Sequence, residues 1–568
     1  MAMNETGVIT TLRPWLRHLA RRRGRLAIGA LLMLLALMAA LGLLALSGWF
    51  ITATGLTGLA LAAGAAVTLD VYVPGGGIRT FALTRTLARY GERLYNHDTV
   101  LRLLADLRGH LFSVLAALDL SSLSRRRASD WLNRLTADID SLDSLFLRLL
   151  APALVALVAI LALSGFVALW APLAGGSVAL VLGLVWVWLT FGQARWGMAA
   201  SRRRVAELER LRGRVIEHLA GMAELETFGA LAEQRQRLDV IEARLREDQR
   251  QLGRIAALGM ALGGLVIGLA WLLAFWVGAT LWEAERLSGP VLVMIPLAIM
   301  ALNEAVMALP MAFTQFGATL AAAERLNALE AARLAPSEPV ASRDLPSGPL
   351  PLVLDGVSLR YPGALKAALA DVSLTLAAGE RVALCGPSGA GKSSIAALVA
   401  RQLRPDSGAI YLGGCAVEEL DEAALRRRLA VLTQDSELFD DSLAANLWLG
   451  NPQASEAALW QRLDDVELGD WARELPHGLA TRVGEGGRRL SGGQARRVAL
   501  ARLMLRDPGL VLLDEPFNGL DAPLARRLAA RLDQWLEGRS VIVFSHHHEP
   551  EVQPLPGVSR RVNLSHQG

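Results

Sequence analysis

Cysteine is scarce in this sequence, and charge is missing from long parts of its first half. Only Cys385 and Cys415 occur among 568 residues, and they form no Cys-x-x-Cys pair. Both cysteines lie in the part of the chain whose composition is typical of a cytosolic domain. We therefore expect neither disulfide bonds nor a thiol-redox activity. Residues 26–69 contain no charged side chain, and the chain is 53% hydrophobic with a mean hydropathy of +0.35. This composition excludes an ordinary soluble enzyme.

Apolar stretches that can cross a membrane are concentrated in the first half of the chain. A helix needs about 20 apolar residues to span a bilayer core, and such stretches start near Leu26, Ala151, Ser177, Ala256 and Val291. Arginines between positions 17 and 25 precede the first stretch, whereas the connection 169–177 has no basic residue. The positive-inside rule therefore predicts a cytoplasmic N-terminus. A cleaved signal peptide is disfavoured, because the first run is too long and further spans follow.

The excess of basic residues in the chain is also explained by membrane topology. The net charge is +4, which would suit a nucleic-acid partner, but the basic residues flank the membrane spans and lie on long cytoplasmic helices. Membrane topology explains them, so no nucleic acid is expected as a partner.

The composition changes near residue 333. The segment RLAPSEPVASRDLPSGPLP, residues 333–351, is rich in proline and cannot continue a helix. Strand-like runs then alternate with helical patterns, which predicts an α/β domain with a largely parallel sheet. We therefore expect a transmembrane domain over residues 1–332, a linker over 333–350 and an α/β domain over 351–568.

A phosphate-binding loop opens a helix of the α/β part. The segment GPSGAGKSS, residues 386–394, matches GxxxxGK[ST] and follows an apolar strand, the context that this motif requires. Its glycines let backbone N–H groups converge on phosphate oxygens at a helix N-terminus. Lys392 is expected to reach the β- and γ-phosphates of ATP, and Ser393 to ligate Mg²⁺. The expected nucleotide-binding residues are Gly386, Ser388, Gly389, Gly391, Lys392, Ser393 and Ser394.

An acidic pair ends a second apolar strand. The segment LVLLDEP places Asp514 and Glu515 directly after four apolar residues. Asp514 suits Mg²⁺ ligation, and Glu515 is placed to polarise the attacking water. Such a pair is a weak signal alone, but it is a strong one when it follows a phosphate-binding loop in the chain.

Between these motifs lies LSGGQ, residues 490–494, and with it the chain resembles the ATP-binding cassette (ABC) superfamily over roughly residues 351–550. The resemblance implies that Tyr361 stacks on adenine and that Gln434 senses Mg²⁺ and the γ-phosphate. It also implies that Asp521 lies in a loop crossing the dimer interface and that His546 contacts the γ-phosphate. The neighbouring histidines lack the spacing of metal ligands, so no metal site is expected there.

The same resemblance implies a dimer. In this superfamily the signature residues, here Ser491, Gly492 and Gly493, complete the ATP site of the opposite cassette. A chain with one cassette therefore has to dimerise to hydrolyse ATP. Six spans ahead of one cassette look like an exporter-type half-transporter, whose helices extend well beyond the bilayer.

The stretch RTLARYGERLYNHD, residues 85–98, carries a polar stripe. Arg85, Arg89, Arg93 and His97 are spaced by four residues and share one helix face. If the second span begins after VPGGG (73–77) and runs from Ile78 to Leu118, the stripe lies in or near the membrane, and residues 52–72 form an outward apolar segment. If the second span is 52–72 instead, the stripe lies in the cytosol. We expect the first, because proline and glycine interrupt a helix at VPGGG and because the length of a helix from Ile78 to Leu118 fits a membrane core plus a cytoplasmic extension. Hydropathy alone favours the second.

A stripe within the membrane has to face a cavity or partner helices, because charge in lipid is costly. Glu92 can neutralise part of Arg89. The remaining positive charge suits an anionic cargo, and His97 can offer a nitrogen ligand to haem iron while arginines meet the propionates. A solvated helix face is the plainer alternative.

Longer segments narrow the resemblance. LSGWF (46–50), TRTLARYGERLYNHD (84–98), LNRLTADIDSLDSLFLRLLAP (132–152), ELETFGA (224–230) and GEGGRRLSGG (484–493) together resemble the CydC family, one of two subunits of the bacterial CydDC exporter that supports cytochrome bd assembly. The resemblance implies a CydD-type partner, a location in the bacterial cytoplasmic membrane, export of cysteine and glutathione, and haem binding near His97. Segment 127–143 resembles a loop that transmits cassette closure.

The leading hypothesis is therefore an α-helical six-span transmembrane domain of ABC exporter type fused to an α/β P-loop ATP-binding cassette, which exports small thiols or haem with ATP and Mg²⁺. One alternative is a homodimeric exporter of drugs or lipids. Another is a haem- or redox-sensing membrane ATPase that moves no cargo.

Overall fold

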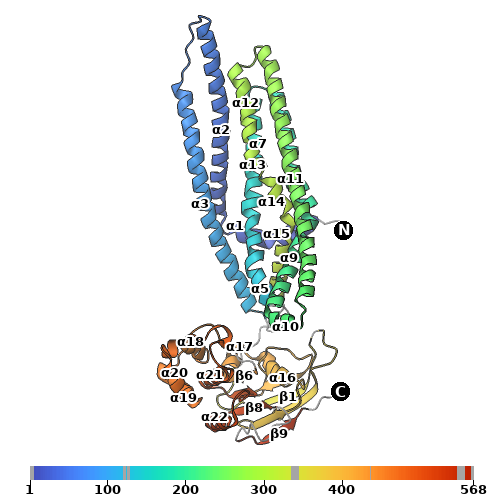
Figure 1. Ribbon diagram of the computed structural model, residues 1–568, viewed down its shortest axis with the longest axis vertical. Coiled ribbons are helices and arrows are strands. Elements are labelled where there is room, and N and C mark those ends of the chain that lie inside the picture. The colour runs from blue at the N-terminus through green and yellow to red at the C-terminus, as the bar shows by residue number, and fades with distance from the viewer. Residues whose placement is uncertain are drawn as a thin grey trace. The chain divides into compact units, whose positions relative to one another are not determined.

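The computed structural model describes residues 5–118, 123, 128–333, 344–361, 363–434, 437–545 and 557–564. The described residues up to Leu118 and those from Ala128 to Arg333 belong to one compact unit, and those from Asp344 onward belong to a second (Figure 1). Each unit is a separate fold with its own core.

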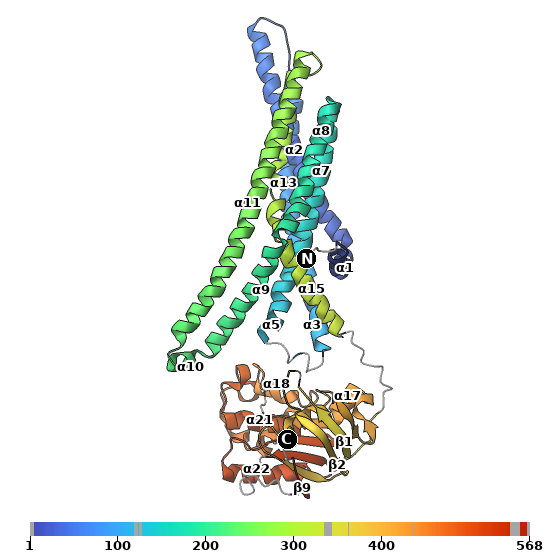
Figure 2. The same ribbon diagram turned by 90° about the vertical axis from the view of Figure 1, so that its right-hand side faces the viewer.

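The first unit is a bundle of long helices (Figure 2). Its helices are α1 (Glu5–Ala20), α2 (Arg23–Ala62), α3 (Tyr72–Ala116), α5 (Ala128–Asn133), α6 (Ile139–Ser144), α7 (Ala151–Ala168), α8 (Pro172–Val187), α9 (Gln193–Ala220), α10 (Met222–Thr227), α11 (Leu231–Glu283), α12 (Gly289–Ala301), α13 (Asn303–Val306), α14 (Leu309–Thr314) and α15 (Phe316–Arg333). π-helical turns at Arg134–Asp138, Leu145–Leu150 and Trp188–Gly192 connect neighbouring helices.

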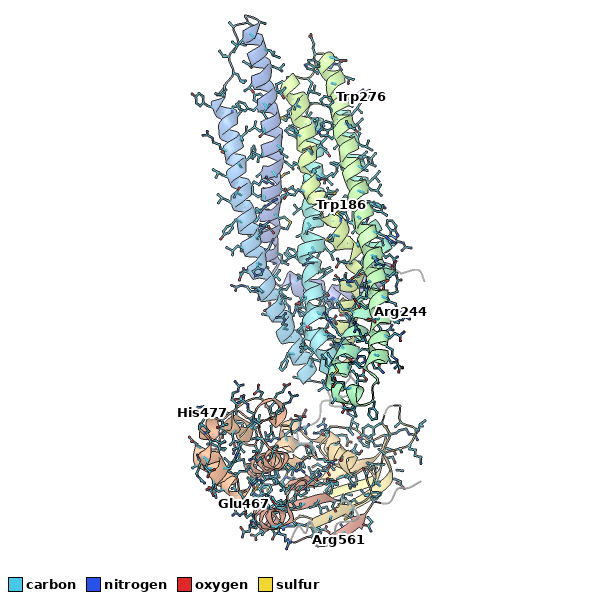
Figure 3. All side chains as sticks on the ribbon, viewed as in Figure 1. Trp186, Arg244, Trp276, Glu467, His477 and Arg561 are labelled. Carbon is cyan, nitrogen blue, oxygen red and sulfur yellow. The ribbon has the colours of Figure 1, made fainter. Side chains whose placement is uncertain are left out.

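Within the described residues, five helical segments are long and apolar enough to cross a membrane. They are Arg23–Ala62, Asp130–Ala168, Pro172–Ala220, Leu231–Glu283 and Gly289–Thr314. The long helices change character along their length: Trp276 lies in the apolar part of α11, and Arg244 in its charged part (Figure 3). Helix α3 is the sixth long helix, and its polar stripe keeps it out of this apolar set. The predicted six-span exporter architecture is confirmed.

The predicted bounds of the second long helix are wrong at its start. Helix α3 begins at Tyr72 and continues through VPGGG, and residues 52–62, expected in a separate apolar segment or span, prolong α2. Pro74 is tolerated because it lies in the first turn, where a missing N–H breaks no helical hydrogen bond. The Asp70 carboxylate accepts hydrogen bonds from the backbone N–H groups of Tyr72 (2.8 Å) and Val73 (3.3 Å) and so caps the helix.

The second unit has two sheets. A four-stranded antiparallel sheet has the order β2 (Leu369–Leu376), β1 (Leu352–Leu359), β4 (Ser407–Leu412), β5 (Cys415–Ala416). A five-stranded parallel sheet has the order β6 (Leu429–Leu432), β7 (Leu510–Asp514), β8 (Ser540–Ser545), β3 (Arg381–Cys385), β9 (Arg560–Asn563). The predicted α/β cassette with a largely parallel sheet is confirmed.

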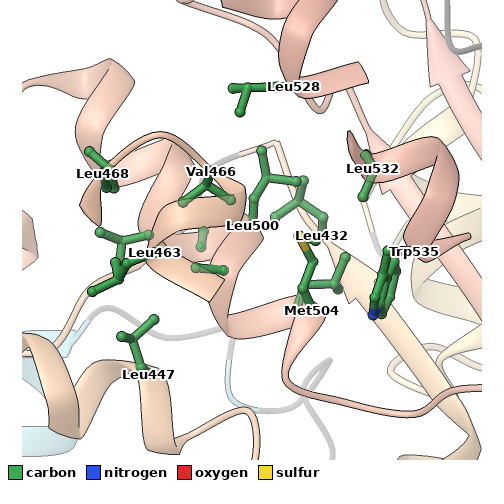
Figure 4. Close-up of a cluster of buried hydrophobic side chains, with 14 of the residues drawn as sticks. Leu432, Leu447, Leu463, Val466, Leu468, Leu500, Met504, Leu528, Leu532 and Trp535 are labelled. Atoms are coloured by element: carbon green, nitrogen blue, oxygen red, sulfur yellow. The ribbon is translucent and has the colours of Figure 1, made fainter. Parts of the chain in front are cut away.

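Helices cover these sheets. They are α16 (Lys392–Val399), α17 (Glu422–Arg428), α18 (Leu443–Trp448), α19 (Glu456–Asp465), α20 (Gly469–Glu474), α21 (Gly492–Met504) and α22 (Ala522–Trp535). One core packs α16 between the two sheets. A second joins α18, α19, α21 and α22 to the parallel sheet, with Leu432, Leu500 and Trp535 among its members (Figure 4). These cores fix the positions of the ends of β3 and β7, from which the candidate site is built.

Candidate nucleotide-binding site

The phosphate-binding loop connects β3 to α16. Gly389 and Gly391 have φ angles of +82° and +86°, which only glycine adopts without strain. At Gly391 a Cβ atom would also lie 2.5 Å from the carbonyl oxygen of Ala368, so the loop has no room for a side chain there. Gly386, the first glycine of the motif, receives its position from a hydrogen bond between its N–H and the Ser545 carbonyl at the end of β8 (3.3 Å).

Lys392 lies buried under the loop. Its ammonium group donates to the carbonyl oxygens of Gly386 (2.6 Å) and Pro387 (3.0 Å). Burial lowers the pKa of Lys392, against the charges of Glu515 and Asp514, which raise it. The lysine is therefore poorly solvated, and its two hydrogen-bond acceptors are neutral carbonyl oxygens. A phosphate oxygen is charged and accepts a stronger hydrogen bond, so it can replace them.

Two oxygen ligands suited to Mg²⁺ lie next to each other. The Ser393 hydroxyl donates to the Asp514 carboxylate over 2.8 Å, joining the start of α16 to the end of β7. Burial raises the pKa of Asp514, and the neighbouring Glu515 charge adds to the rise. A buried carboxylate beside a hydroxyl is a donor set that hard divalent cations prefer, so these residues fit the predicted ion.

Glu515 is buried in a strained conformation. Its φ of 45° is in the left-handed region, which costs free energy for a residue with a side chain and often marks functional sites. The Asn518 side chain donates to its carboxylate over 2.9 Å. The orientation of the Glu515 carboxylate is therefore fixed by its backbone conformation and by the hydrogen bond from the Asn518 amide.

Arg496 is a site residue that the sequence did not single out. It is buried on α21, and its guanidinium donates to the carbonyl oxygens of Thr433, Gln434, Asp514 and Glu515. The bonds to Gln434 and Glu515 are 3.1 and 2.8 Å long. One side chain thus ties the loop after β6 to the acidic pair after β7. The signal in the sequence was an arginine two positions after LSGGQ, on the buried face of the helix that begins within this motif.

The other predicted nucleotide residues surround this centre. The Tyr361 hydroxyl lies 3.1 Å from that of Ser394, which places the aromatic ring beside α16 with 42% of the residue exposed. Ser388 and Gln434 are exposed, so both are accessible to a ligand. His546 lies outside the described residues.

The signature residues form an exposed helix N-terminus. Ser491 caps α21, accepting from the Gln494 N–H while the Gln494 side chain accepts from the Ser491 N–H. Asp521 likewise caps α22. Among the described residues, no hydrogen bond or ion pair joins Ser491, Gly492 or Gly493 to the phosphate-binding loop. The signature therefore stays available to another molecule.

The polar stripe of the first unit is divided between two environments. Arg85 and Arg89 both pair with Glu304 of α13, whereas Asp98 pairs with Arg25 of α2. The expectation that Glu92 neutralises Arg89 is wrong, because the Glu92 carboxylate accepts from the Asn96 side chain instead (2.7 Å). His97 is exposed on α3.

Comparison with protein families gives two matches along the chain. Residues 26–306 match the model described as the ABC transporter transmembrane region. Residues 369–518 match the model described as ABC transporter. The two matched regions fall in the first and second unit, respectively.

Curated relatives match almost the whole chain. The glutathione/L-cysteine transport system ATP-binding/permease protein CydC of Escherichia coli K12 is 34% identical over 97% of this chain and 93% of its own length. The protein of the same name from Haemophilus influenzae is 31% identical over 94% and 92%. An ATP-dependent lipid A-core flippase of Albidiferax ferrireducens is 28% identical over 83% and 81%.

A solved structure shares the fold. A bacterial Atm1-family ABC exporter with ATP bound superposes with a TM-score of 0.77 at 23% identity, covering 93% of this chain and 91% of the other. At this identity the match supports the architecture alone.

Proposed function

Because the chain belongs to the CydC family of ABC transporter ATP-binding/permease proteins, we propose that it is one half of an ATP-driven exporter of glutathione and cysteine in the bacterial cytoplasmic membrane. The observation that carries the proposal is the similarity to two glutathione/L-cysteine transport proteins along nearly the whole chain. The chain is an ATP-hydrolysing, multi-pass membrane transport protein, and the cargo and direction are the proposed part.

We assign the chemistry of ATP hydrolysis to the residues at the ends of β3 and β7. Lys392 exchanges its two carbonyl partners for phosphate oxygens, and Glu515 polarises the attacking water. Ser393, Gln434 and Asp514 would hold Mg²⁺, which when bound would supply positive charge to neutralise the phosphates. Tyr361 stacks on the adenine, and His546 contacts the γ-phosphate. The cassette spans 351–568, after a linker at 333–350 and a membrane domain at 1–332.

We assign the second half to a CydD-type partner. The exposed signature residues on α21 support this, since they are available to complete an ATP site on another cassette. A relative named as the CydD protein of Bacillus subtilis is 30% identical over 84% of this chain, which supports a partner subunit of similar fold. The arginines ahead of α2 support a cytoplasmic N-terminus and cassette.

Haem is the second candidate cargo, and the exposure of the Arg93–His97 end of the stripe favours it. Arg93 and His97 lie one helical turn apart on α3, and both are exposed. A histidine nitrogen and a guanidinium so spaced suit haem iron and a propionate. A haem titration that follows the Soret band, with and without His97→Ala, tests this.

Transport into inside-out vesicles that contain this chain and a CydD-type partner tests the main proposal. We expect ATP-dependent accumulation of labelled glutathione, and loss of that accumulation in Glu515→Gln, which keeps the cassette fold and removes the base. Arg526→Lys, an exposed change on α22, is the matched control and should transport normally.

Two outcomes contradict the proposal. Glutathione-stimulated ATP hydrolysis without accumulation would identify a sensor rather than an exporter. Accumulation of lipid or drug by this chain without a partner would favour the homodimeric exporter.

A further inference from the structure

Two arginines on one helix meet a single glutamate on another. Arg85 and Arg89 lie one turn apart on α3, and both guanidinium groups pair with the Glu304 carboxylate of α13. The Arg85–Glu304 distance is 3.3 Å, and each arginine uses a different carboxylate oxygen. These residues are more than 200 positions apart in the chain, so only the fold brings them together.

The packing of α2 against α3 places this cluster at the level of an apolar stretch of α2. Gly42 lies against the Phe81 ring, and Gly29 lies against the Asn96 side chain. Arg85 and Arg89 lie between these two crossings, alongside residues 30–41 of α2, which contain no charged or polar residue. Glu304 itself lies within the apolar segment Gly289–Thr314.

Charge at this depth is costly and marks functional sites in membrane proteins. The cluster also has an excess of positive charge, because two guanidinium groups share one carboxylate. Its side chains are 39% (Arg85), 35% (Arg89) and 44% (Glu304) exposed. A cluster that is open on one side and short of one negative charge can accept an anion.

The helix that carries Glu304 is broken at this point. Helix α12 ends at Ala301, α13 has only four residues, and α14 starts at Leu309, with Pro296 and Pro310 on either side. In secondary transporters, discontinuous helices near the middle of the membrane commonly form the binding sites. Glu304 therefore lies where the segment is interrupted rather than within one continuous helix.

We propose that Arg85 and Arg89 bind a carboxylate of the cargo, and that Glu304 occupies this site when no cargo is bound and is displaced by it. This rests on the proposed function and specifies its substrate class: a small molecule with a free carboxylate. Glutathione carries two such groups, cysteine carries one, and haem carries two as its propionates. Two guanidinium groups suit such a group, since they bind carboxylates by charge-assisted hydrogen bonds.

Binding to the purified complex of both halves tests the site without requiring transport. The probes are glutathione and its diethyl ester, in which both carboxylates are masked. In the wild-type complex we expect glutathione to bind about tenfold or more tighter than the ester, the effect of one charge-assisted interaction. In Arg89→Gln that preference should disappear, because glutathione weakens and the ester does not.

Two further variants sharpen the test. Glu304→Gln removes the competing carboxylate and should tighten glutathione binding while leaving ester binding unchanged. Arg102→Gln is the matched control, since Arg102 lies on α3 but pairs with Asp98 instead. It should bind both probes as the wild type does.

The results distinguish failure of the proposed carboxylate site from failure of the proposed cargo. Equal weakening of acid and ester in Arg89→Gln, or no effect on either, overturns the proposal. Haemin and haemin dimethyl ester, followed by the Soret band, form the second arm. If the carboxylate preference and its loss appear with haemin alone, the site stands and the thiol proposal fails. If they appear with neither probe, the site is not a carboxylate site.

Discussion

At the residue scale, Arg496 shows how a buried charge can organise the candidate nucleotide-binding site. Its planar guanidinium presents five donors in a fixed geometry, and here it bonds carbonyl oxygens on both sides of the candidate site. Lysine carries the same charge, but its compact ammonium has only three donors and cannot span the four carbonyl oxygens that the guanidinium bonds. The position of Glu515, which is already strained, therefore depends on a residue that need not touch ATP.

We expect Arg496→Lys to lower ATP hydrolysis by about tenfold or more, because the acidic pair and the Gln434 loop lose their common support. The cassette should also lose about 1–3 kcal/mol of unfolding free energy, the typical cost of unsatisfied buried polar groups. Steady-state hydrolysis and thermal unfolding measure the two effects. Arg526→Lys should change neither, and normal activity in Arg496→Lys would contradict the assigned role.

At the scale of helices and strands, the sequence predicted the features that depend on residues close together in the chain. The phosphate-binding loop follows a strand and opens α16 because its glycines tolerate the required backbone angles. The start of α3 was not predicted, because a proline and three glycines hide a helix that Asp70 caps from outside. The pairing of Arg89 with Glu304 could not be predicted, since it depends on how distant helices pack.

The N-terminal helix α1 is fixed to the bundle by specific contacts. The buried Trp15 donates to the Asn327 side chain of α15 over 2.9 Å, and the His18 ring lies 4.8 Å from that of His110. His110 in turn bonds the Glu330 carboxylate over 2.7 Å. Burial lowers the pKa of His18, as do the charges of His110 and Arg21, while Glu330 and Asp106 oppose the shift.

This arrangement makes the docking of α1 depend on pH. A lowered pKa means that the folded state favours neutral His18, so protonation at acidic pH destabilises the docked helix. We expect hydrogen exchange in α1 to speed up between about pH 7.5 and about pH 5.5, after correction for the intrinsic rate. His18→Gln should remove the pH response, and Arg17→Gln should keep it. An equal response in all three proteins would contradict this reading.

At the scale of the whole molecule, the chain combines a bundle of long helices with an ATP-binding cassette, and each unit holds part of a site. The cassette presents a phosphate-binding loop and an exposed signature. Within the described residues, no hydrogen bond or ion pair connects the two. The bundle presents the partly exposed cluster of Arg85, Arg89 and Glu304, for which we propose a carboxylate ligand. Both features are consistent with a chain that works as one half of a pair.

ATP hydrolysis by the chain alone and together with a CydD-type partner tests this central claim most directly. The account predicts negligible hydrolysis by the chain alone, substantial hydrolysis by the complex, and a reduction when the signature is blocked by Ser491→Arg in this chain only. Full hydrolysis by the isolated chain would contradict the account, because each ATP site would then be complete without a different partner.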